Sequence, residues 1–286
     1  MAAGKLFLVA TPIGNLADVT LRALRVLKEV DLIACEDTRH TVRLLDHYGI
    51  TTPRQSYHEH NEAGRTTQLV ELMRQGKNIA LVADAGTPLI SDPGHTLVSA
   101  CRRAGIEVVP IPGASAAIAA LAASGLSADT FFFAGFLPPR SSARRQALEK
   151  LSGIPVSLVF YEAPHRLLSA LEDMVGILGP RQACLARELT KVHEEWLSGT
   201  LPEILQQLKG RTRIRGEITL VIEGNRQAPV AAGHPESLQE HLQEEMQRTG
   251  ASRKEALKAV ARQRGISRRA AYQLLLQNKK LTGSQD

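Results

Sequence analysis

Short apolar runs alternate with segments of helical periodicity along the first part of the chain. The runs Lys5–Ala10, Leu32–Cys35 and Ile79–Ala83 are typical of strands that are buried on both faces. Between them, apolar positions recur every three or four residues, which predicts amphipathic helices. These helices cover about Leu21–Val30, a stretch that ends near Tyr48, and Ala63–Gln75. Strands that alternate with helices in this way predict a mostly parallel sheet with helices on its faces.

The pattern continues after residue 125 with more strands. Phe131–Phe136 reads as a strand that contains four of the six phenylalanines, so we expect it at the centre of a second core. The helix that follows has the sequence SSARRQALEKL, and we expect its Arg144, Arg145 and Lys150 to be exposed. Further strands are expected within Val156–Pro164, Ala183–Thr190, Glu194–Gly199 and Gly216–Gly224. The fold class is therefore α/β with two α/β domains, 1–112 and 113–224, the second with a mixed sheet.

A small basic helical domain is expected at 236–286, after a polar linker with two prolines. Ser252 and Glu255 form a capping box for one helix, Gly265 ends it, and Ser267 begins another, which is the outline of a helix-turn-helix. Residues 247–280 contain ten Lys or Arg and one acidic residue, whereas the whole chain has a net charge of +6. This imbalance favours nucleic acid as a partner over a merely solvated helical face. The candidate RNA-binding residues are Arg253, Lys254, Arg268 and Arg269.

The composition and the absence of several known motifs exclude some classes of protein. The three cysteines are far apart and form no CxxC pair, which favours reduced thiols in a cytoplasmic protein. No apolar run reaches the length that spans a membrane, so no membrane partner is expected. The chain has no GxxxxGK[ST], no GxGxxG after the first strand and no GxSxG. The segment His58–His60 lacks further metal ligands, so no metal site is expected.

Two neighbouring loops have the composition of a ligand cradle. Val82–Gly94 begins as a buried strand and breaks into small residues and glycine, which allow a ligand to approach the backbone. We expect Asp92 to cap the following helix, with Pro93 at its first position. Glu107–Leu126 repeats the unit as a strand, a Pro-Gly turn and a helix of very small side chains. Either loop alone is compatible with an ordinary strand-to-helix turn, but the pair favours a ligand site at the carboxyl ends of parallel strands.

Several blocks together resemble a known family. They are VATPIGNLADVTLRA, CEDTR, DAGTPLISDPG, PGASAAIAAL, YEAPHRL, ARELTKVHEE and GEITLVIEG. The combination resembles the tetrapyrrole methylase superfamily, whose members use S-adenosyl-L-methionine and hold it in the cleft between two α/β domains. It is most similar to the branch that methylates the 2′-oxygen of a cytidine ribose in the decoding region of 16S ribosomal RNA. The later loop reads AGTP where tetrapyrrole-modifying members have Gly-Asp-Pro, which argues against a porphyrin-type substrate.

The resemblance implies a set of cofactor-binding residues, a partner and an oligomeric state. The first loop would edge the cleft, and the later loop would border the methionine part. Two small residues would contact the cofactor from the first helix of the second domain, and a further group would surround the adenine. These residues are Pro12, Ile13, Gly86, Thr87, Ile90, Ser115, Ala116, Tyr161, Leu189 and Ile218. Core packing is the alternative interpretation of Leu189 and Ile218, and helix capping that of Ser115. The resemblance also implies a homodimer that acts on ribosomal RNA or the small ribosomal subunit.

Candidate catalytic residues follow the strands that end at the expected cleft. A ribose hydroxyl is a poor nucleophile at neutral pH, so a nearby base or cation is needed. Of the polar residues there, we expect Asp37 and Arg39 to handle the substrate, and Asp84 to act as the base or to bind the cofactor's ammonium. A helix cap with a local ion pair is the alternative for Asp37 and Arg39. Two other functions stay open: a methyltransferase acting on a tetrapyrrole precursor, and a ligand-sensing DNA-binding regulator.

Overall fold

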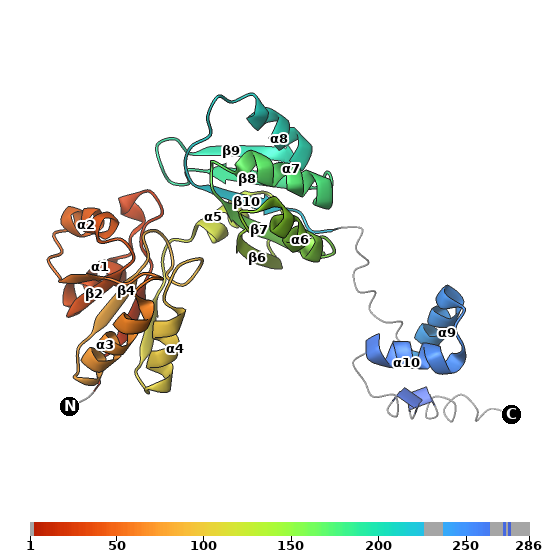
Figure 1. The fold of residues 1–286 in the computed structure, drawn as a ribbon, viewed down its shortest axis with the longest axis horizontal. Helices are drawn as coiled ribbons and strands as arrows, with labels where there is room; N and C mark the ends of the chain where they lie inside the picture. The colour runs from red at the N-terminus through yellow and green to blue at the C-terminus, as the bar shows by residue number, and fades with distance from the viewer. Residues whose placement is uncertain (1–2, 226–236, 264–270, 273, 276–286) are drawn as a thin grey trace. The chain divides into compact units, whose positions relative to one another are not determined.

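The computed structural model describes residues 3–225, 237–263, 271–272 and 274–275. The chain divides into two compact units, Met1–Asn225 and Arg226–Asp286, which are described here one at a time (Figure 1). Within the described ranges, no helix has the length and apolar character needed to cross a membrane.

The first unit begins with a parallel sheet of five strands in the order β3-β2-β4-β1-β5. The strands are β1 (Leu6–Val9), β2 (Leu32–Cys35), β3 (Arg54–Ser56), β4 (Ile79–Val82) and β5 (Val108–Ile111). All four residues of β4 are buried, as a strand with helices on both faces requires. The prediction of a parallel sheet from the alternating pattern is confirmed.

Helices cover both faces of this sheet (Figure 1). On one face lie α1 (Leu21–Glu29) and α2 (Thr38–His47), which pack around Ile33 and Val82. On the other lie α3 (Glu62–Arg74) and α4 (His95–Arg103), which pack around Leu81. The short 3-10 helix η1 (Leu16–Asp18) lies in the loop after β1.

A second, mixed sheet has the strand order β6-β7-β10-β8-β9. β6 pairs parallel with β7, and the other pairs are antiparallel. Its strands are β6 (Phe131–Phe136), β7 (Ser157–Glu162), β8 (Gln182–Arg187), β9 (Glu195–Thr200) and β10 (Ile218–Ile222). Its helices are α5 (Ala116–Ala123), α6 (Ser141–Leu151), α7 (Leu167–Leu178) and α8 (Leu201–Lys209). α5 packs on one face and the other three on the opposite face, so the predicted α/β class and mixed sheet are confirmed.

The phenylalanine-rich strand does not lie at the centre of the second core. β6 is an edge strand, and Phe131, Phe132 and Phe136 are 37%, 42% and 53% exposed. A short apolar run does not distinguish an edge strand from a central one, because periodicity reports burial of a face and not the place in a sheet. The prediction was therefore wrong, and the buried β7 and β10 form the centre of this sheet.

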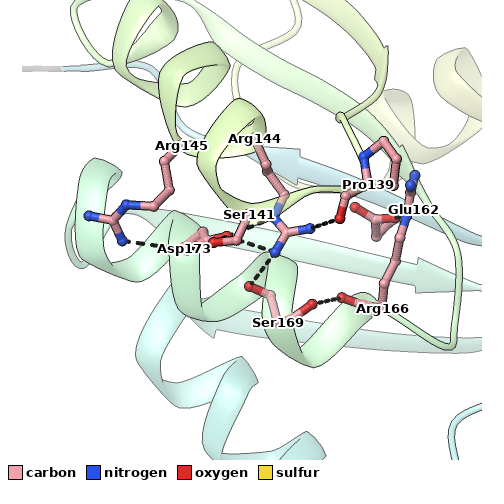
Figure 2. A network of polar contacts seen from close by, with 8 residues as sticks. All are labelled: Pro139, Ser141, Arg144, Arg145, Glu162, Arg166, Ser169 and Asp173. Atoms are coloured by element: carbon pink, nitrogen blue, oxygen red, sulfur yellow. Dashed lines mark hydrogen bonds and ion pairs between the residues drawn. The ribbon is translucent and has the colours of Figure 1, made fainter.

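Arg144 is buried, which also contradicts the sequence prediction. Its guanidinium forms an ion pair of 2.7 Å with Asp173 of α7, and it donates hydrogen bonds to the carbonyls of Pro139 and Ser169 (Figure 2). Ser141 also donates to Asp173, at 2.9 Å. The partner carboxylate lies on another helix, so the local pattern of α6 gave no sign of it. Arg145 is half exposed and contacts the other oxygen of Asp173.

The second unit contains two described helices, α9 (Leu238–Thr249) and α10 (Arg253–Gln263), which pack through Leu242, Leu257 and Val260. Ser252 and Glu255 make the expected contacts at the start of α10. Arg253 and Lys254 are exposed in its first turn. Gly265, Ser267, Arg268 and Arg269 lie outside the described residues, so the helix-turn-helix stays a prediction.

Candidate functional site

The loops after β1 and β4 are joined by backbone hydrogen bonds. Thr11 N–H donates to Gly86 O at 2.9 Å, and Gly86 N–H donates to Thr11 O at 3.0 Å. Gly86 has φ +80°, a conformation that glycine adopts without strain. Both loops leave carboxyl ends of parallel strands, so the sheet fixes their position at one edge.

The expected cap at Asp92 was wrong. α4 begins at His95, and its N-cap is Gly94 with φ +134°. A Cβ at Gly94 would lie 2.8 Å from Leu81 Cδ2, so the chain there approaches the core more closely than another residue allows. The prediction of the cap used only the local sequence, which does not show that the backbone at Gly94 packs closely against Leu81. Asp92 instead faces a cavity.

A cavity of about 420 Å³ is lined by residues of the first sheet's loops and of the second sheet. It contains nine of the ten predicted cofactor residues, and they are Ile13, Gly86, Thr87, Ile90, Ser115, Ala116, Tyr161, Leu189 and Ile218. Pro12 lines an adjoining cavity of about 250 Å³, and Asp84 lines both. The structure therefore brings together residues that are separated by up to 206 positions in the chain.

One side of the larger cavity is apolar. Tyr161, on β7, accepts a hydrogen bond from the Ala117 backbone N–H at 3.2 Å, which satisfies a donor at the start of α5. Leu189 and Ile218 are 8% and 3% exposed, so they belong to the core and line the cavity at once. Ser115 occupies the N-cap position of α5, but its side chain makes no capping hydrogen bond there.

The other side is acidic. Glu36, Asp84 and Asp92 line it together. Burial, followed by the charges of Glu36 and Asp84, raises the pKa of Asp92 to about 7. Burial and then the charge of Asp84 also raise the pKa of Glu36. Carboxylates in excess over the basic groups beside them favour a positively charged occupant.

Glu162 is a further carboxylate that the sequence reasoning did not single out. It is 2% exposed and lines the larger cavity. Its Oε1 accepts hydrogen bonds from Ala163 N–H and from Arg166, while Oε2 has no hydrogen-bond partner within the described part of the chain. Figure 2 shows Glu162 beside Arg166. Its position in the YEAPHRL block was the one available signal.

Asp37 and Arg39 line neither cavity. They form an ion pair of 2.6 Å, and Asp37 caps α2 by accepting a hydrogen bond from Arg39 N–H. The hydrogen bond from the Arg39 side chain, together with that from its backbone, lowers the pKa of Asp37 to about 2. These contacts match the capping interpretation. Asp37 also donates its backbone N–H to Asp84 Oδ1 at 2.9 Å, and so holds the Asp84 carboxylate in place.

Backbone strain is concentrated in two loops beside the cavities. In the described residues, positive φ outside glycine occurs at Leu89, Ser91, Glu188 and Thr190. The first two follow β4, and the second two lie between β8 and β9. Such conformations cost of order 1–3 kcal/mol each and cluster at functional sites. Of these four residues, Ser91 lines the larger cavity itself.

Comparison with known proteins agrees with this arrangement. The chain is 49% identical over 275 residues to "Ribosomal RNA small subunit methyltransferase I" of Synechocystis sp., covering 96% of this chain and 98% of that protein. A protein of the same name from Escherichia coli O157:H7 is 52% identical over 225 residues, covering 78% and 79%.

Solved structures share the fold at lower identity. Uroporphyrin-III C-methyl transferase from Thermus thermophilus, complexed with S-adenyl homocysteine, matches with a TM-score of 0.55 and 20% identity, covering 76% of this chain and 97% of that one. The family model described as Tetrapyrrole (Corrin/Porphyrin) Methylases matches residues 5–205. The chain, with its two sheets and the cavity that residues of both line, therefore belongs to the tetrapyrrole methylase family.

Proposed function

We propose that this protein transfers a methyl group from S-adenosyl-L-methionine to the ribose 2′-oxygen of a cytidine in the decoding region of 16S ribosomal RNA. The observation that carries the proposal is the near full-length similarity to proteins named ribosomal RNA small subunit methyltransferase I. Relatives of that name are about half identical in sequence, and the match extends over the cavity-lining residues of both sheets.

The larger cavity fits the cofactor by size and charge. Its volume of about 420 Å³ lies within the usual range for small-molecule sites. Glu36, Asp84 and Asp92 would face the cationic part of the cofactor, and Tyr161, Leu189 and Ile218 would surround the adenine. Bound S-adenosyl-L-methionine supplies a methyl group that its sulfonium makes electrophilic.

The protein's own contribution would be positioning and proton removal. Asp84 lines both cavities, and its Oδ1 is held by the backbone N–H of Asp37. Its carboxylate would accept the proton of the 2′-hydroxyl. Holding the hydroxyl in line with the methyl group would supply further barrier reduction, of order 7–11 kcal/mol at the upper limit.

Other parts of the chain would serve substrate binding. The domains 1–112 and 113–224 would form the cofactor cleft, and the basic domain 236–286 would contact RNA phosphates through Arg253, Lys254, Arg268 and Arg269. Asp37 and Arg39 would steer the substrate from the rim. A cytoplasmic homodimer acting on ribosomal RNA or the small subunit completes the proposal.

The test is transfer of labelled methyl from S-adenosyl-L-methionine to small ribosomal subunits, or to their naked RNA, from a strain that lacks this protein. Label in an alkali-resistant dinucleotide is expected, because a 2′-O-methyl group blocks alkaline cleavage of the adjacent bond. Label in alkali-labile mononucleotides would contradict ribose methylation. Label in a tetrapyrrole precursor alone, or tight duplex DNA binding without methyl transfer, would replace the proposal with one of the two alternatives.

A further inference from the structure

A second cavity of about 250 Å³ adjoins the larger one. Ile13, Asp84, Ala85 and Glu217 line both, so the two spaces meet at these side chains. In the second cavity, Pro12 and Leu16 from the loop after β1 contribute apolar side chains to the lining. A reactant in this cavity would lie next to Asp84 without occupying the cofactor's space.

Two elements contribute basic side chains to the lining of this cavity. His40 and Arg43 lie three residues apart on α2, on the same face of that helix, and both line the cavity. Lys191 lines it from the loop between β8 and β9. Near a target ribose, cationic groups of this kind would bind phosphate oxygens.

The three basic side chains differ in their contacts with carboxylates. His40 Nδ1 lies 3.7 Å from Asp84 Oδ2. Lys191 contacts Glu188 at 2.9 Å and Glu217 at 3.2 Å. Although burial opposes it, these carboxylates keep the pKa of Lys191 raised. Arg43 is exposed and makes no ion pair or hydrogen bond within the described residues. Its guanidinium is therefore the cation that is available to an incoming anion.

The size of the cavity limits its occupant. At about 250 Å³ it is smaller than the roughly 300–1,000 Å³ of sites that enclose a whole small-molecule ligand. It suits one nucleotide unit of a longer polymer, with the rest of the chain outside, better than a complete macrocycle. A planar guanidinium also binds phosphate in a bidentate manner.

We infer that the smaller cavity is the subsite for the target nucleotide of the RNA, with Arg43 binding the phosphate next to the ribose and Pro12 and Leu16 contacting its apolar faces. This inference rests on the proposed function, because it names where the RNA of that reaction binds. It places the reacting ribose beside Asp84, at the wall that the two cavities share.

The experiment uses the full-length chain with unmethylated small subunits or their RNA. Arg43→Ala is expected to raise the KM for RNA about tenfold and to lower the salt slope of RNA binding by about 1. The Kd of S-adenosyl-L-methionine, measured by calorimetry, should stay unchanged. Arg43→Lys should restore the salt slope, because it keeps the charge, while regaining only part of the KM.

The matched control is Arg103→Ala. Arg103 is an exposed arginine of α4, on the opposite face of the same sheet, and it lines neither cavity. The Arg103→Ala variant should have the same KM for RNA and the same salt slope of RNA binding as the parent protein. An Arg43→Ala protein that melts like the parent and keeps its KM and slope would overturn the subsite alone. A parent protein that incorporates no methyl into ribosomal RNA would instead overturn the proposed function.

Discussion

Two groups of buried or half-buried charged side chains are built in opposite ways. Around Asp173, a carboxylate meets Arg144, Arg145 and Ser141, so its charge and its hydrogen-bonding capacity are matched (Figure 2). Around Asp92, burial and then the negative charges of Glu36 and Asp84 raise its pKa. Matched charges hold α6 to α7, whereas the acidic group at the cavity is suited to a cation, as the proposed function requires. On that proposal, the first cluster is structural and the second is functional.

The comparison predicts the largest effect where a matched pair is broken. Arg144→Ala leaves the Asp173 carboxylate buried with less compensation, and loss of one partner of a buried pair costs about 3–5 kcal/mol. The free energy of unfolding, measured with urea, should fall by that amount. Arg145→Ala is the matched control, because Arg145 contacts the same carboxylate from a side chain that is 50% exposed. It should cost less than about 1 kcal/mol. Equal losses for the two variants would contradict the distinction.

Neutralising a carboxylate of the acidic group should instead leave stability level or raised, while activity falls. Asp84→Asn keeps an oxygen that can accept the hydrogen bond from Asp37 N–H, and it removes a negative charge next to Glu36 and Asp92. We expect the melting temperature to stay level or rise, while methyl transfer falls tenfold or more, which is about 1.4 kcal/mol of barrier. Turnover at the parent rate with unchanged cofactor binding would exclude Asp84 as the base.

The smallest effect concerns Asp92 and depends on pH. Its pKa rises from 3.8 to about 7 on folding, so the unfolded chain loses this proton at lower pH than the folded one. Ionisation of Asp92 therefore lowers the free energy of unfolding progressively as pH rises from about 4 to about 7. Above that range its contribution is constant. Asp92→Asn should stabilise the protein by about 1 kcal/mol at pH 8, after allowance for solvent screening, and leave it unchanged near pH 3.

Denaturation of the parent and variant across this pH range measures the effect. A difference between the two proteins that is the same at pH 4 and pH 8 would show that Asp92 is not titrating in this window.

Part of the fold was predictable because its signals are local. The runs that became β1, β2 and β4 are apolar throughout, and the two loops of small residues follow strands directly. The cofactor residues were carried over from the family resemblance, and the structure gathers nine of them around one cavity. Their binding role stays a prediction.

What was not predictable depends on partners far away in the sequence. Arg144 was expected to be exposed because α6 alone shows a polar position there, while Asp173 lies 29 residues later. The place of β6 at the edge follows from the pairing of β7 with β10, which no pattern within β6 reports. Asp92, from the loop after β4, and Glu162, on β7, became candidates only when the fold placed both beside one cavity.

The lining of the larger cavity extends from Ile13 to Thr219 in the sequence, which affects when the cavity can form during synthesis. Chains leave the ribosome amino end first, and domains fold as units in that order. The first sheet is complete once β5 has emerged, but the cavity lacks a wall until β10 has been made and inserted between β7 and β8. For the synthesis of about a hundred residues, the nascent chain would therefore contain all strands of the first sheet and the acidic side of the cavity, but not its opposite wall. The cofactor cavity of such a fold is therefore complete only after β10 has been synthesised.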